Sequence, residues 1–68
     1  MNAEAIGRKL REARGFDRSQ ADVAAAVGVS PAAISQYERG ERIPEDRIKL
    51  ALAEYFGTTV QDLFFTPE

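Results

Sequence analysis

Residues 20–38 read QADVAAAVGVSPAAISQYE and carry the signals of two short helices separated by a sharp turn. The first helix is predicted over residues 20–27, and Gly28 supplies the positive φ that a turn directly after a helix needs. Ser30 is a favourable N-cap for the second helix. Pro31 suits the first helical position, because proline has no N–H that would be left unpaired in the first turn. A connection this short makes the two helices cross at a large angle.

The flanking sequence shows the same helical period, with glycines at the boundaries. It predicts a helix over residues 3–14, another over about residues 45–56, and a short one that starts after residue 58 or 59. No stretch alternates convincingly with a period of two, which argues against strands. The expected fold is therefore all-α, a compact five-helix domain over residues 1–68. The expected core residues are Ile6, Leu10, Ala13, Val23, Ala24, Val27, Ile34, Tyr37, Ile48, Leu52 and Tyr55.

Composition makes several functional classes improbable. The 68 residues include no cysteine and no histidine, which removes disulfides, thiolate zinc sites, the commonest metal ligand and the usual general base. An enzyme is therefore not expected, and neither is a metal or another cofactor. The longest apolar run, residues 23–27, is far too short to span a membrane, and no secretory signal opens the chain, so the expected location is the cytoplasm. The net charge of −2 counts against indiscriminate binding to nucleic acid.

Two helices around a three-residue turn form a helix-turn-helix, whose second helix can enter the major groove of DNA. Nearly the whole chain, about residues 6–65, resembles the phage-repressor-like helix-turn-helix domains, also called the XRE or Cro/repressor family. The matching stretches are IGRKLREARG (residues 6–15), SQADVAAAVGVSPAAISQYERGERIP (residues 19–44) and IKLALAEYFGTTVQDLFF (residues 48–65). The resemblance implies a sequence-specific DNA-binding transcriptional regulator, a repressor that acts as a homodimer on a palindromic operator in bacteria, phages or mobile elements.

The chain departs from the family pattern at two places. Residues 16–18 lengthen the loop before the second helix. The recognition helix opens with Pro31, Ala32 and Ala33, where many relatives carry side chains that can hydrogen-bond to bases. The second departure weakens the case for rich hydrogen-bond readout.

The exposed positions of the predicted recognition helix are the candidates for base readout. Gln36 can pair with adenine through two hydrogen bonds, while Ala32 and Ala33 can offer only methyl groups, for example to thymine. Ser35 can hydrogen-bond to a base or to a phosphate. The alternative for the alanines is that they let the helix sit deep in the groove without reading a base.

Phosphate contacts are expected at the helix starts and in the loop after the recognition helix. Gln20 lies where unpaired N–H groups and the helix dipole favour an anion, and the resemblance gives it the same role. Arg39 and Arg42 bracket Gly40 and are the leading phosphate clamps, unless they pair with the glutamates around them. The other candidates for phosphate contact are Ser19, Ser30 and Pro31. Weaker candidates for phosphate contact, each expected instead to be a solvated surface cation, are Lys9, Arg14, Arg18 and Arg47.

The resemblance also implies a structural ion pair between Arg11 and Glu38, which would orient the recognition helix. The apolar segment over residues 58–66 is expected to form the dimer surface. Its candidate residues are Val60, Leu63, Phe64 and Phe65, of which Val60 and Leu63 are also expected to cover part of the core. The alternative is that both phenylalanines cap a small core.

A second function remains open at this stage. The chain could be a protein-interaction module, such as an antitoxin-like or anti-repressor subunit, that uses the same fold to bind another protein. The acidic net charge and the Pro-Ala-Ala opening of the recognition helix favour this alternative. The expected partners under the first hypothesis are double-stranded DNA and a second copy of the chain, with no membrane and no small-molecule ligand.

Overall fold

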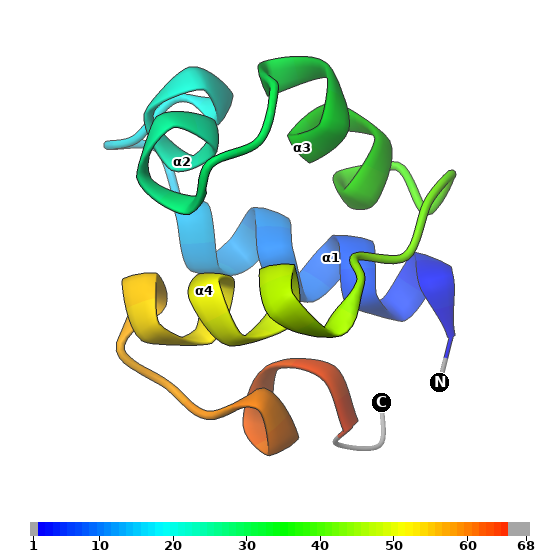
Figure 1. Cartoon of the computed structure of the whole chain (residues 1–68). Coiled ribbons are helices and arrows are strands. Elements are labelled where there is room, and N and C mark those ends of the chain that lie inside the picture. Colours follow the sequence, from blue (N-terminus) through cyan, green and yellow to red (C-terminus); the bar gives the residue numbers. More distant parts are fainter. Residues whose placement is uncertain (1, 66–68) are drawn as a thin grey trace.

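The computed structural model describes residues 2–65, which form helices and loops without a strand. The helices are α1 (Ala3–Arg14), α2 (Gln20–Val27), α3 (Pro31–Glu38), α4 (Asp46–Phe56) and the single π-helical turn η1 (Gln61–Phe65). Figure 1 shows α2 and α3 on one side of the molecule, α1 and α4 below them, and η1 on the far side. The all-α class with five helices is confirmed. None of the described helices is long and apolar enough to cross a bilayer.

Local capping fixes the two helices of the central segment. The Ser19 hydroxyl accepts a hydrogen bond from the N–H of Asp22 at 3.0 Å, and the Asp22 carboxylate accepts one from the N–H of Ser19 at 3.0 Å. The Ser30 hydroxyl accepts from the N–H of Ala33 at 3.1 Å, with proline at the first helical position. Gly28 has a left-handed conformation with φ of 79°, so the chain turns sharply between the helices as expected.

One glycine permits the close approach of α1 to α3. A Cβ atom on Gly7 would lie 2.4 Å from the carbonyl oxygen of Glu38 and 2.7 Å from that of Tyr37. Both distances are shorter than a Cβ atom makes with a neighbouring heavy atom in a folded protein, so no larger residue fits at this position without moving a backbone. The end of α3 therefore rests directly on the first half of α1.

The core gathers side chains from every helix. Its members are Ile6, Leu10, Val23, Ala24, Val27, Ala33, Ile34, Tyr37, Ile48, Leu52, Ala53, Leu63 and Phe64. The expectation that Ala13 belongs to it is wrong, because Ala13 is exposed. The buried stripe of α1 instead continues from Ile6 and Leu10 to the half-buried Arg14, at intervals of four residues. Tyr55 is half-buried at the edge of the core.

The C-terminal turn confirms that Leu63 covers the core and, for Phe64, the alternative of a core position, and so reduces the expected dimer surface. Leu63 and Phe64 are core residues, and Phe64 is only 4% exposed, so neither side chain is available to a second chain. Phe65 is 47% exposed and Val60 is half-buried, which leaves these two from the expected set at the surface. Residue 66, the last of the expected segment, lies outside the described residues.

The longer loop over residues 15–19 is closed by two arginines. Arg14 donates a hydrogen bond from Nη1 to the carbonyl oxygen of Arg18 at 3.1 Å. The guanidinium carbon of Arg18 lies 5.1 Å from the ring centroid of Tyr55 and 5.6 Å from that of Phe56, in cation–π geometry. The expectation that both arginines are solvated is therefore wrong. The loop nevertheless presents Phe16 fully to solvent.

Candidate nucleic-acid interface

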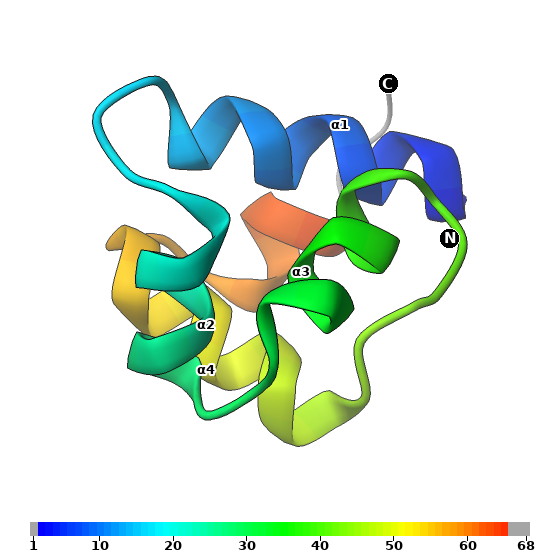
Figure 2. The same ribbon diagram turned by 90° about the horizontal axis from the view of Figure 1, so that it is seen from above.

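The helix α3 has one buried and one exposed face, and the exposed face carries most of the expected base readers. Figure 2 looks onto the side of the molecule where α2 and α3 lie. Ala32 is exposed, and Ser35 and Gln36 are half-buried one turn further along. Ala33 is only 5% exposed and belongs to the core, because it lies on the same face as Ile34 and Tyr37. Ala33 is therefore removed from the base-reading set, and Ala32, Ser35 and Gln36 remain candidates.

A buried carboxylate joins three helices behind this face. The side chain of Glu38 is 3% exposed. Its Oε2 accepts a hydrogen bond from Arg14 Nε at 2.6 Å, and its Oε1 accepts from Arg14 Nη2 at 2.9 Å and from Gln20 Nε2 at 3.1 Å. These contacts connect the end of α3 to the end of α1 and to the start of α2. They fix the orientation of the exposed face relative to the rest of the molecule.

The charge of Glu38 is stabilised in spite of its burial. Burial alone would raise the pKa of this carboxyl, but the hydrogen bonds from Arg14 and Gln20, with the charges of Arg14 and Arg11, outweigh it. The pKa of Glu38 is therefore held below its ordinary value. The same pairing raises the pKa of Arg14 through its hydrogen bond to Glu38.

The expected ion pair between Arg11 and Glu38 is present, but it is the weaker of two ion pairs at this carboxylate. The two side chains approach only to 4.0 Å, and Arg11 is 63% exposed. Arg14 makes the close contact, although sequence reasoning assigned it to a solvated surface. Its position one helical turn after the buried Leu10 is the signal that could have identified it.

The helix starts present the expected phosphate contacts in different ways. Ser19 and Ser30 are exposed, but their hydroxyl oxygens accept the capping hydrogen bonds described above. Pro31 is exposed at the first position of α3. Gln20 is the first residue of α2 and uses one side-chain N–H on Glu38, which holds its carboxamide at the start of the helix.

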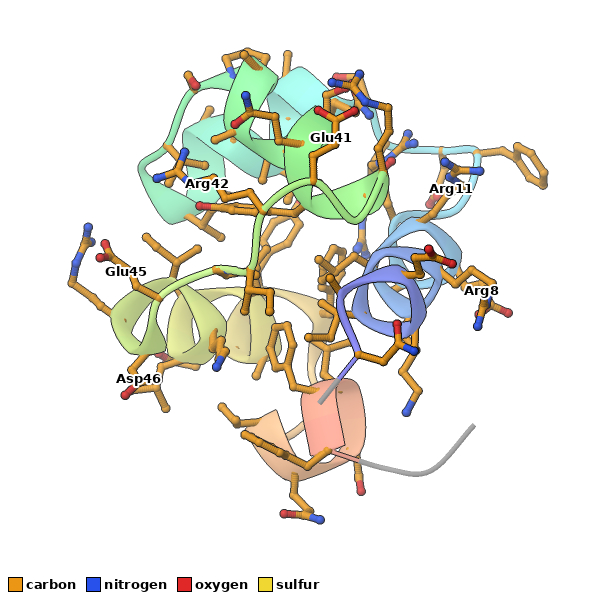
Figure 3. All side chains as sticks on the ribbon, turned by 90° about the vertical axis from the view of Figure 1, so that its right-hand side faces the viewer. Arg8, Arg11, Glu41, Arg42, Glu45 and Asp46 are labelled. Carbon is orange, nitrogen blue, oxygen red and sulfur yellow. The ribbon has the colours of Figure 1, made fainter. Side chains whose placement is uncertain are left out.

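The two arginines of the loop after α3, Arg39 and Arg42, were expected to act alike but make different contacts. Arg39 forms a two-point ion pair with Glu41, through Nε to Oε2 at 2.8 Å and Nη2 to Oε1 at 3.0 Å. The guanidinium carbon of Arg42 lies 5.6 Å from the ring centroid of Tyr37, and among residues 2–65 no carboxylate comes within 4.0 Å of it. Figure 3 shows Glu41 and Arg42 on the side of α2 and α3, with Glu45 below them. Arg42 is thus the loop cation open to a phosphate.

A separate apolar surface lies at the start of α4 and the end of η1. Leu50 and Phe65 are both exposed, and together with Val60 they line a shallow pocket of about 250 Å³. Lys49 and Asp46 complete the lining, and Lys49 Nζ lies 5.6 Å from the ring centroid of Phe65. Sequence reasoning missed Leu50, because α4 carries apolar residues on more than one face. Within the part of the chain that the structure describes, no cluster of acidic side chains is arranged to hold a metal ion.

Comparison with known proteins identifies the fold. The helix-turn-helix family model HTH_3 matches residues 8–63. Among solved structures, the chain is similar to the P22 c2 repressor in complex with a synthetic operator, with 34% identity, coverage of 88% of this chain and 92% of that chain, and a TM-score of 0.84. A search of curated protein sequences gives no match.

Two further solved structures agree with this assignment. The restriction-modification controller protein C.AhdI from Aeromonas hydrophila is 28% identical, with coverage of 91% of this chain and 96% of that chain and a TM-score of 0.83. The clp gene regulator ClgR from Corynebacterium glutamicum is 29% identical with a TM-score of 0.82. The match covers 90% of this chain but 66% of ClgR, slightly less than two thirds of its length.

Proposed function

The chain belongs to the HTH_3 helix-turn-helix family of XRE-type DNA-binding regulators, and from that membership we propose that it is a transcriptional repressor that binds a palindromic operator as a homodimer. It acts in the cytoplasm and performs no catalysis. The observation that carries the proposal is the partly exposed stripe of α3 beside Arg42, a cation that pairs with no carboxylate among the described residues. Ala32, Ser35 and Gln36 form the stripe, and Arg42 lies in the loop that follows it.

The base-reading role falls to Gln36 with Ala32 and Ser35 as neighbours. A glutamine can bond to the N6 and N7 positions of adenine, which gives discrimination that a methyl contact cannot. Ala32 has no polar side-chain atom, so its contribution is a contact with a thymine methyl group. Few side chains therefore specify the sequence, and each one contributes a large share of the discrimination.

The phosphate-binding role falls to Arg42 and to the starts of α2 and α3. Arg42 offers a guanidinium whose charge no described carboxylate neutralises. Gln20 retains one side-chain N–H beyond the one used on Glu38, at the positive end of the α2 dipole. Ser19, Ser30 and Pro31 provide the backbone that approaches the duplex at these two helix starts.

The dimer surface proposed here is smaller than the C-terminal segment first expected. Leu50, Val60 and Phe65 form a continuous apolar patch around one shallow pocket. Association of two such patches about a two-fold axis would remove the Phe65 ring of each copy from water. A dimer of this family type would present its two recognition helices about 34 Å apart, one turn of the double helix.

Selection of binding sites from a random DNA pool tests the proposal. The expected result is a consensus with two-fold symmetry and half-site centres about one helical turn apart. Enrichment of a single unpaired half-site would reject the homodimer while keeping the regulator. A pool without enrichment would reject the regulator and favour the protein-interaction module, an antitoxin-like or anti-repressor subunit.

A further inference from the structure

The contacts of Arg39 make it different from an ordinary surface arginine. Three of its N–H donors are engaged: Nε and Nη2 donate to the two oxygens of Glu41 at 2.8 and 3.0 Å, and Nη1 donates to Ser35 Oγ at 2.6 Å. All three side chains lie on the outer side of α3 and its following loop. The guanidinium is therefore held at three points at once.

The hydrogen bond to Ser35 decides where the guanidinium lies. Ser35 is one helical turn before Arg39, on the half-exposed side of α3 that also carries Gln36. An arginine at a helix end can extend away from the helix toward a phosphate, but this one folds back over the stripe assigned to base readout. Glu41, three residues past the last residue of α3, holds it from the other side.

The donors that remain match a base edge. An arginine has five N–H donors, and the three contacts leave two, one on each terminal nitrogen. Donors on the two terminal nitrogens of one guanidinium can pair with the O6 and N7 acceptors of guanine, the commonest specific contact between arginine and DNA. Because Glu41 and Ser35 already hold the guanidinium of Arg39, it loses little rotational freedom when it binds a base.

The ion pair itself contributes little to folding. Both side chains are exposed, and pairs of this kind between solvated groups add almost no stability. Its consequence for binding is larger, because the Glu41 carboxylate cancels the charge of Arg39 and would repel a phosphate at the same place. Glu41 therefore favours contact of Arg39 with a neutral base edge over contact with the phosphate backbone of DNA.

We propose that Glu41 is a specificity-determining residue that, together with Ser35, positions Arg39 to read a guanine next to the base read by Gln36. The inference rests on the proposed function, since it concerns the same DNA-binding face. It reassigns Arg39 from phosphate clamp to base reader and leaves Arg42 as the loop's phosphate contact.

The test compares variants of the 68-residue chain on the site that the wild-type chain selects. Competition binding measures the affinity for that site, for every single-base change in it and for a scrambled duplex. Arg39→Ala and Glu41→Gln are each expected to lower the preference for guanine at one position of each half-site by about tenfold and to leave the other positions unchanged. Glu41→Gln is also expected to bind the scrambled duplex more tightly, with a salt slope steeper by about one per subunit.

The matched control is Glu45→Gln. Glu45 is an exposed carboxylate paired with Arg47 at 3.6 Å, so the substitution makes the same charge change beside another surface arginine. It should leave every base preference as in the wild type. Circular dichroism melts confirm that each variant is folded.

Three results would overturn the inference. A selected site without guanine, an unchanged guanine preference in Glu41→Gln, or an equal loss at all positions in Arg39→Ala would each return Arg39 to the role of phosphate clamp while the DNA-binding function stood. Failure of the wild-type chain to select any site would instead reject the proposed function itself.

Discussion

The guanidinium of Arg14 meets the carboxylate of Glu38 through two hydrogen bonds, Nε to Oε2 at 2.6 Å and Nη2 to Oε1 at 2.9 Å. The contact joins the end of α1 to the last residue of the recognition helix. Because Glu38 is buried, its charge is tolerated only while this partner is present. The orientation of the exposed face of α3 therefore depends on a residue that never needs to touch DNA.

Replacing Arg14 by alanine should lower the free energy of unfolding by about 3 kcal/mol, because it leaves a buried carboxylate without its closest cation. Arg11→Ala is the matched control from the same helix, and its exposed, distant contact should be worth about 0.5 kcal/mol or less. Urea unfolding of both variants measures the difference. Equal effects in the two would show that Arg14 is not the principal partner.

The stability of the chain should fall in acid through Glu38. The pKa of this carboxyl is lowered in the folded state, so its contribution is complete above the unfolded value of about 4.3 and is lost as the pH falls through the folded value. The difference in unfolding free energy between the wild type and Glu38→Gln should therefore shrink below about pH 4. Thermal or urea unfolding from pH 7 to pH 2 measures it. A difference that does not change with pH would contradict the stabilised charge.

Gly7→Ala should destabilise the fold by about 3 kcal/mol or more, since a methyl group at this position collides with the backbone of α3. Alanine is the better helix former, so the loss would occur in spite of local preference. Gly28→Ala is the control: a Cβ there meets nothing within 4 Å, and the cost of about 1 kcal/mol comes only from its left-handed φ. Urea midpoints that rank the two variants in the opposite order would reject the close contact of α1 with α3.

Phe65→Ser should dissociate the proposed dimer without loss of stability in the monomer, because the ring of Phe65 is half-exposed in the single chain. Phe64→Ala is the contrasting variant and should cost about 3 kcal/mol or more, since its side chain fills the core. Sedimentation at micromolar concentration reports the association, and thermal melts report the stability. Monomeric wild-type protein at these concentrations would argue against the Leu50–Val60–Phe65 surface.

The helices could be predicted because residues close together in the sequence determine where each helix begins and ends. Ser19 caps α2 with Asp22, and Ser30 with its following proline starts α3, so three or four residues decide each boundary. Which residues of a helix face the core depends also on residues that are distant in the sequence. Ala13 and Arg14 both follow the Leu10 stripe, and only the placement of Glu38 beside α1 determines that the arginine faces inward.

The candidate site was predicted less completely than the fold. The solvent-facing stripe of α3 follows from the helical period once the core face is known, but Ala33, expected on that stripe, lies on the core face with Ile34 and Tyr37. The role of Arg39 depends on how a loop folds back, which residue types alone do not specify. Phe64 was expected at the dimer surface, with a place in the core as the alternative, and its burial confirms the alternative.

In the proposed complex, Gln36 faces a base while Arg42 holds the phosphate backbone. Binding of the wild type, Gln36→Ala and Arg42→Ala to the selected site and to a scrambled duplex tests it in one titration series. Gln36→Ala should lose about tenfold in the ratio of the two affinities, and Arg42→Ala should weaken both duplexes alike and make the salt slope shallower by about one per subunit. Equal losses on both duplexes in the two variants would contradict the claim.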